Sequence, residues 1–247
     1  MSDTDPNSGP GWNDHDTPYG TIHSYDAPGS LGTGGNAGSH TNIGPTTRLS
    51  IPSTKTYDGI YMTMCANNLM AHEGFVNAIY ADSKGNPTVG IGHLLANIDA
   101  ALGMRFLKTY HQSLGHGDST NIEVAATSTD VRNGYNQVLN HPGSRAAVHL
   151  SNDDAIQACI ADVQETEKGL RGLYANYDHF TDNAKTGLVD MGFNLGIPRL
   201  RNEFPKFNAA VNRGDWGTAA TESHRTGIGD KRNADTAHNF QQALAGH

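Results

Sequence analysis

The stretch from Glu73 to His93, EGFVNAIYADSKGNPTVGIGH, contains side chains that can carry out acid–base chemistry. Glu73 and Asp82 are nine positions apart, and the hydroxyl of Thr88 follows six positions later. Two carboxyl groups that flank a cleft, one protonated and one ionised, can hydrolyse a glycosidic bond, with the hydroxyl holding the attacking water. The alternative is that both acids are solvated surface carboxylates, which is where such residues usually lie.

The residues around these acids predict a helix followed by a short β-hairpin. Apolar residues recur at helical spacing at Met62, Cys65 and Leu69, so Glu73 falls near the C-terminal end of an amphipathic helix that stops near Gly74. After it, AIYAD is rich in strand formers, SKGN is typical of a turn, and PTVGIGHL is a second strand-compatible run. A carboxylate on the helix can then face a carboxylate and a hydroxyl on the hairpin across a groove.

The same stretch resembles the catalytic signature of the phage-type lysozymes, glycoside hydrolase family 24. In that pattern a Glu-Gly pair is followed by an Asp, a Thr and a Gly-x-Gly-His run at the intervals found here. The resemblance implies an endo-acting muramidase that needs no cofactor. It would hydrolyse, with inversion, the β-1,4 bond between N-acetylmuramic acid and N-acetylglucosamine in bacterial peptidoglycan, causing lysis. Glu73 would be the general acid, Asp82 the base or electrostatic partner, and Thr88 the residue that positions water.

The resemblance also implies roles for residues outside this trio. Arg232, near the start of the final helix, would pair with the catalytic glutamate, although Lys231 or Arg225 could take its place. His93 would pair with Asp162 on a long helix and brace the hairpin. The residues expected to bind substrate or support the site are Gly90, His93, Asn194 and Arg232.

The resemblance covers roughly residues 58–245 and implies an α+β, mainly α, lysozyme-like fold with two lobes. We expect a small β-hairpin lobe at about 56–150, a linking helix at about 151–172 and a C-terminal helical-bundle lobe at about 173–247. Ser151 and Asp154 are typical of the start of the linking helix. The run AKTGLVDMGFNLG predicts a buried helix, and Asp215 an N-cap before Trp216.

Residues 96–150 are harder to interpret. The runs LGMRFLKTYHQSL and VRNGYNQVL are compatible with short helices on either side of the polar loop GHGDSTN. This segment is longer than in the shortest phage-type lysozymes, and it could line part of the sugar groove.

Residues 1–55 differ in composition from the rest of the chain. They hold nine glycines and six of the ten prolines, with few large aliphatic residues. Such a segment buries too little apolar surface to offset its ordering entropy, so we expect it to be disordered, extended, or ordered only against a partner. We interpret it as an N-terminal extension for delivery or partner binding.

The composition of the chain excludes some classes of binding partner. The net charge is −8, and residues 56–247 alone carry 15 basic and 20 acidic residues, which argues against a nucleic-acid binder. The two cysteines, Cys65 and Cys159, lie at apolar positions of predicted helices and are expected to be buried free thiols. No metal-ligand spacing is present among the thirteen histidines. We expect a monomer without stable membrane insertion, with peptidoglycan glycan strands as substrate.

The sequence has neither a Sec-type signal pattern nor a long apolar run. We therefore expect synthesis in the cytoplasm and action in the periplasm or on a bacterial wall. Delivery machinery and an immunity or inhibitor protein are possible partners, and both a phage endolysin and a secreted antibacterial effector fit. Two alternatives remain: a non-catalytic peptidoglycan-binding or phage-structural module with the same fold, and a chitinase or transglycosylase.

Overall fold

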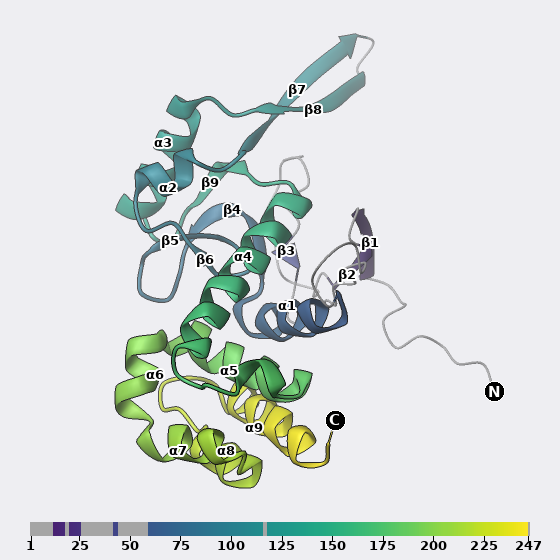
Figure 1. Ribbon diagram of the computed structural model, residues 1–247. Coiled ribbons are helices and arrows are strands. Elements are labelled where there is room, and N and C mark those ends of the chain that lie inside the picture. The colour runs from purple at the N-terminus through teal and green to yellow at the C-terminus, as the bar shows by residue number, and fades with distance from the viewer. Residues whose placement is uncertain (1–11, 18–19, 26–41, 44–58, 116–117, 247) are drawn as a thin grey trace, which may run out of the picture. The chain divides into compact units, whose positions relative to one another are not determined.

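The computed structural model describes all residues except 1–11, 18–19, 26–41, 44–58, 116–117 and 247 (Figure 1). The chain divides into two compact units, one formed by residues 1–52 and 69–159 and the other by 53–68 and 160–247. Two helices pass from one unit into the other, α1 (Gly59–Glu73) and α4 (Asn152–Arg171).

The first unit is built on an antiparallel sheet with strand order β6-β5-β4-β9-β7-β8. Its strands are β4 (Phe75–Ala81), β5 (Pro87–Gly90), β6 (His93–Leu94), β7 (Leu107–Gly115), β8 (Asp118–Ala125) and β9 (Arg145–His149). Two helices accompany it, α2 (Ile98–Leu102) and α3 (Ser128–Asn140). Phe75 and Ile79 on β4 are completely buried, and Asn77 and Ala78 between them are buried as well, so both faces of this strand are covered at its centre.

The helix and hairpin expected around the two acids are confirmed. Helix α1 ends at Glu73, and Gly74 follows with a φ of +74°, a left-handed conformation that glycine adopts without steric strain. Strands β4 and β5 pair antiparallel, with Ala81 opposite Pro87 and Tyr80 opposite Thr88. The start of α4 is also confirmed, because Ser151 Oγ accepts a hydrogen bond from the Asp154 backbone N–H at 3.1 Å.

The expected helix in LGMRFLKTYHQSL is wrong. Only Leu102 of this run belongs to α2, and most of the remainder forms β7, which pairs with β8 over eight residue pairs (Figure 1). The pairing sets Tyr110 opposite Ile122, two strand-forming residues that suit a cross-strand pair. The helix expected in VRNGYNQVL is confirmed as part of α3.

In its described residues the second unit contains helices joined by turns, and no strand. Its elements after α4 are η1 (Tyr177–His179), α5 (Asp182–Leu195), α6 (Ile197–Glu203), α7 (Pro205–Arg213), α8 (Trp216–Glu222) and α9 (Asp230–Leu244). Gly187 on α5 allows close packing on α9, because a Cβ there would lie 2.8 Å from Cζ of Phe240. The Trp216 ring stacks on the Phe240 ring at a centroid distance of 6.2 Å. As expected, Asp215 caps α8 by accepting the Thr218 N–H at 3.0 Å.

A buried carboxylate joins the first half of α1 to α4 inside this unit. Glu167 accepts hydrogen bonds from the hydroxyls of Tyr61, at 3.0 Å, and Tyr177, at 3.1 Å. Cys65 is completely buried in the same region, and its thiol lies 3.8 Å from the hydroxyl of Thr186. Cys65 and Cys159 are both buried thiols that are not joined in a disulfide, which confirms the expectation for the two cysteines.

Parts of residues 1–55 are described. Strands β1 (Trp12–Thr17) and β2 (Gly20–Tyr25) pair antiparallel, and β3 (Asn42–Ile43) pairs with β4, where Ile43 lies opposite Phe75. The described part of this segment therefore contains extended backbone, and β3 within it pairs with the sheet. Most of the segment, and with it most of the expectation about its order, lies outside the described residues.

Candidate active site

Glu73 lies against the main chain of the turn between β5 and β6. A Cβ placed on Gly92 would come within 3.1 Å of Glu73 Cγ and 3.4 Å of Cδ, and Gly92 has a φ of +69°. Any other residue at position 92 would be strained in this conformation and would push on the carboxyl-bearing side chain. Gly92 thus fixes the space in which the Glu73 side chain lies.

Gly90 has a related structural role. Its φ is +66°, and an added Cβ would lie 3.2 Å from the Cβ of Ala155, which is in the first turn of α4. The glycine lets β5 approach this helix closely. Gly90 therefore supports the geometry of the turn through packing of its backbone.

Asp82 is held in an ionised form by the turn that follows it. One carboxylate oxygen accepts the backbone N–H groups of Lys84 and Asn86, each at 2.8 Å, and the other accepts the Asn86 side-chain amide at 3.1 Å. Partial burial opposes ionisation, but the hydrogen bonds from Asn86 and Lys84 outweigh it and lower the pKa of Asp82 below its usual value. The side chain is only partly buried, so it is a carboxylate that a reactant can reach.

Thr88 lies on β5 with 3 % of its surface exposed. Its hydroxyl donates a hydrogen bond to the carbonyl oxygen of Asn86 at 3.0 Å, which leaves the lone pairs of the oxygen free to accept. Thr88 pairs with Tyr80, and Asp82 follows Tyr80 by two residues. Because directly opposed residues of an antiparallel pair place their side chains on the same face, Tyr80 and Thr88 point to the same side of the hairpin.

Tyr80 belongs to this group of side chains although no motif identified it. Burial raises its pKa to about 12, and the negative charges of Glu73 and Asp82 act in the same direction. Both acids therefore lie close enough to Tyr80 to affect its ionisation. The two-residue interval between Tyr80 and Asp82 in AIYAD is the sequence signal that could have revealed it.

The remaining predicted residues lie in the helical unit or are expected to reach it. Arg232 is 8 % exposed, and its Nε and Nη2 donate to Oδ1 of Asp190 at 3.0 and 2.8 Å. Asn194 accepts a hydrogen bond from Nη1 of Arg225 at 3.2 Å. Within this unit, Arg232 and Asn194 thus belong to a buried polar network. The expected pairing of Arg232 with the catalytic glutamate, and of His93 with Asp162, would join the two units and stays a prediction.

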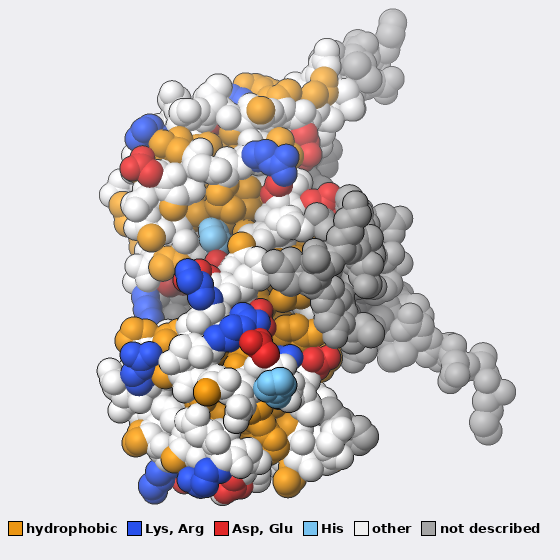
Figure 2. Space-filling view, in the orientation of Figure 1, with side chains coloured by type: hydrophobic (Ala, Val, Ile, Leu, Met, Phe, Trp, Pro, Cys, Tyr) orange, Lys and Arg blue, Asp and Glu red, His pale blue; other side chains and the backbone are white. Residues whose placement is uncertain are grey.

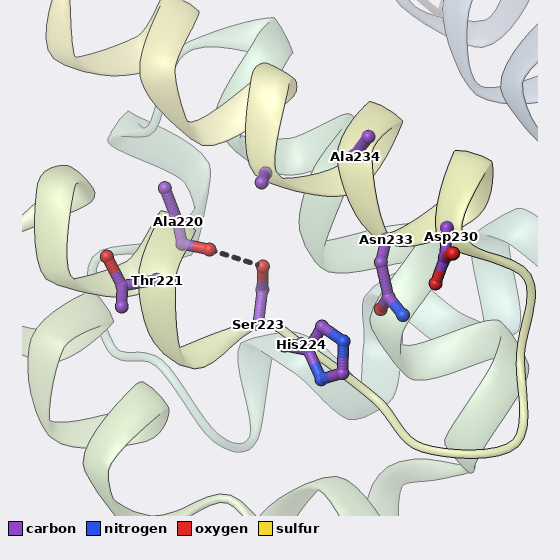
Figure 3. Close-up of a pocket in the computed structure, with 8 residues that line it drawn as sticks. Ala220, Thr221, Ser223, His224, Asp230, Asn233 and Ala234 are labelled. Atoms are coloured by element: carbon purple, nitrogen blue, oxygen red, sulfur yellow. Dashed lines mark hydrogen bonds between the residues drawn. The ribbon is translucent and has the colours of Figure 1, made fainter.

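A pocket of about 330 Å³ lies in the helical unit between α8 and the start of α9 (Figure 3). Its polar groups are largely committed: Ser223 donates to the carbonyl of Ala220 at 2.8 Å, and Asn233 bonds the backbone of Arg225 through both its amide atoms. None of the three predicted catalytic residues lines it. The other residues of the pocket are Thr221, His224, Asp230, Ala234 and Ala237.

On the face of the molecule seen in Figure 2, basic side chains are scattered, and several lie beside acidic ones. Among the described residues, no helix has the length and apolarity required to cross a membrane.

Two carboxyl groups and a hydroxyl, on a helix end and on the hairpin that follows it, are groups that hydrolysis of a glycosidic bond can use. The family model described as phage lysozyme matches residues 70–233, and the chain belongs to this family. Membership makes it a lysozyme-type enzyme that acts on the bacterial cell wall. Similar solved structures include the crystal structure of the active form of P1 phage endolysin Lyz, with 16% identity and a TM-score of 0.43 over 78% of this chain and 87% of that chain. The comparison with curated proteins gives no match.

Proposed function

We propose that the chain is an endo-acting muramidase that hydrolyses the β-1,4 bond between N-acetylmuramic acid and N-acetylglucosamine with inversion. Glu73 donates a proton to the leaving oxygen, Asp82 accepts the proton of the attacking water, and Thr88 orients that water through its hydroxyl lone pairs. The observation that carries this proposal is the turn after β4, whose hydrogen bonds hold Asp82 ionised, as a proton acceptor must be. Glu73, at the end of α1, lies against the main chain at Gly92, in the turn that follows the strand of Thr88.

The products distinguish this reaction from its alternatives. A hydrolase of this bond leaves reducing muramic acid ends, a transglycosylase leaves 1,6-anhydro ends, and a chitinase or a non-catalytic binding module releases no muropeptides from sacculi. We expect mass spectrometry of digested, purified sacculi to show reducing ends. Anhydro ends would replace the hydrolase by a transglycosylase, and the absence of soluble products would support the binding module.

We expect His93 and Asp162 to be coupled in stability. In a double-mutant cycle, His93→Asn and Asp162→Asn should each lower the free energy of unfolding, and the double variant should lose less than the sum. The expected coupling is roughly 0.5–3 kcal/mol, measured by urea unfolding of the full chain. Additive effects would show that the two side chains do not interact.

The net negative charge of residues 56–247 supports delivery of the enzyme to its substrate by other machinery. Residues 56–247 have a net charge of −5, so an anionic wall would weakly repel the enzyme. Such an enzyme suits a phage lysis system or an interbacterial secretion apparatus. Residues 1–55 are then the segment that the delivery machinery binds.

A chain that starts at Lys55 should digest isolated sacculi as fast as the full chain, but it should fail to lyse or kill cells in its native delivery setting. The physical reason is that β4 keeps its pairing with β5 and β9 when the two-residue strand β3 is removed. Both chains are compared in vitro and in cells. Slow digestion of sacculi by the shorter chain would show that the extension is part of the enzyme.

A further inference from the structure

Arg145 is a cation beside the predicted catalytic residues to which none of the steps above gives a role. It begins β9, where it pairs with Tyr80 on β4, and its side chain is exposed. Its carbonyl oxygen accepts a hydrogen bond from the Gln137 side chain of α3 at 3.2 Å, so the backbone at this position is anchored. Within the part of the chain that the structure describes, the guanidinium makes no hydrogen bond or ion pair.

Tyr80 connects Arg145 to the catalytic group. Directly opposed residues of an antiparallel pair place their side chains on the same face, so Arg145, Tyr80 and Thr88 share one side of the sheet. The Tyr80 hydroxyl has no hydrogen-bond partner among the described residues. It is flanked by negative charge from Glu73 and Asp82 and, acting in the opposite sense, by the positive charge of Arg145.

The arrangement therefore has a polarity along the sheet. The end of α1 and the turn after β4 carry the carboxylates suited to the sugar bond, and β9 carries a guanidinium beside the phenol of Tyr80 on β4. A guanidinium and a hydroxyl that both lack protein partners form a donor set for a carboxylate. In peptidoglycan the lactyl carboxyl of muramic acid forms the amide bond to the peptide stem, so the free carboxylates lie on the stems, whereas chitin has none.

We propose that Arg145, assisted by the Tyr80 hydroxyl, binds a carboxylate of the substrate's peptide stem and thereby selects peptidoglycan over uncharged glycans. This proposal rests on the proposed muramidase function and names a specificity determinant of the same site. Because Arg145 acts in substrate binding, its replacement should raise KM and leave kcat unchanged. Because the pair is exposed, salt should weaken the effect.

The test compares Arg145→Gln with the full-length wild type on two preparations of the same sacculi, one native and one with its stem carboxylates converted to amides. We expect the wild type to show a KM about fivefold higher on the amidated preparation, as for a solvent-exposed ion pair. The Arg145→Gln chain should show the same KM on both. Arg132→Gln is the matched control, because Arg132 is also exposed in this unit and does not act on Tyr80.

Equal discrimination between native and amidated sacculi by wild type and Arg145→Gln would overturn the role of Arg145 altogether.

Sedimentation with sacculi makes the inference testable independently of catalysis. The Glu73→Gln chain, with and without Arg145→Gln, is co-sedimented with native and amidated sacculi. Preference for native sacculi that disappears with Arg145→Gln supports the inference even if the wild type proves not to hydrolyse the wall. No preference in the Glu73→Gln chain contradicts it, whatever the catalytic result.

Discussion

The Glu73→Gln chain is expected to fold like the wild type and to lose sacculus digestion by a factor of about 10²–10⁴. Glutamine nearly preserves the shape that fits against Gly92, but it has no proton to transfer to the leaving oxygen. Initial rates of muropeptide release measure the loss, and thermal unfolding checks the fold. A variant that keeps substantial turnover would rule out Glu73 as the general acid.

Two further variants sharpen this experiment. Asp82→Asn should also lose most activity, because the amide cannot accept the proton of water, although its oxygen can still accept hydrogen bonds from the turn. Glu165→Gln on α4 is the matched control, since this glutamate is 75% exposed and lies outside the proposed chemistry. We expect it to digest sacculi at the wild-type rate.

The second large effect concerns stability. Asp190 is fully buried and accepts hydrogen bonds from Arg232, Arg225, at 2.6 Å, and Thr236, at 2.8 Å. Asp190→Asn removes the charge between two buried guanidinium groups and should lower the free energy of unfolding by about 3–5 kcal/mol. Urea unfolding of the full chain measures this value. Asp178→Asn is the control, because its ion pair with Arg171 is exposed and should contribute less than about 1 kcal/mol.

The pH dependence of Asp190→Asn gives a separate check. Burial opposes ionisation of Asp190, but the charges of Arg232 and Arg225 outweigh it and hold its pKa below the usual range. Its stabilising contribution is therefore complete above about pH 4, the ordinary value for Asp, and is lost as pH falls through the lower folded-state value. The difference between wild type and variant should be constant near neutrality and shrink in strong acid. A difference that grows on acidification would contradict the ionised state of Asp190.

The elements of the fold set by local signals could be predicted from the sequence. The helix before Glu73, the turn after Asp82, and the caps at Ser151 and Asp215 each depend on residues within a few positions of one another. The strand β7 could not, because KTYHQSL has no strong preference of its own. Its strand form comes from pairing with β8 and β9, partners that lie further along the chain.

The candidate site likewise contains some residues that local spacing identifies and others that it does not. Its acids and threonine stand in a fixed local pattern, so spacing identified them. Arg145 lies 65 positions after Tyr80 and meets it only through the pairing of β9 with β4. The Asp190 partner of Arg232 is likewise distant, 42 residues away on α5. Long-range pairing of this kind leaves no mark in the spacing of single residues, which is why neither contact was predicted.

The turn at Gly92 bears on how this enzyme can diverge. The proposed acid, Glu73, lies against the main chain of Gly92, whose positive φ favours glycine. A substitution at position 92 therefore cannot be used to change the surroundings of this carboxyl group. Substitutions that alter the surroundings of Glu73 must therefore occur at neighbouring residues that contribute side chains. Homologues that change substrate preference should therefore differ at positions such as Tyr80 and Arg145 while keeping a glycine at position 92, a residue that has no functional group to select.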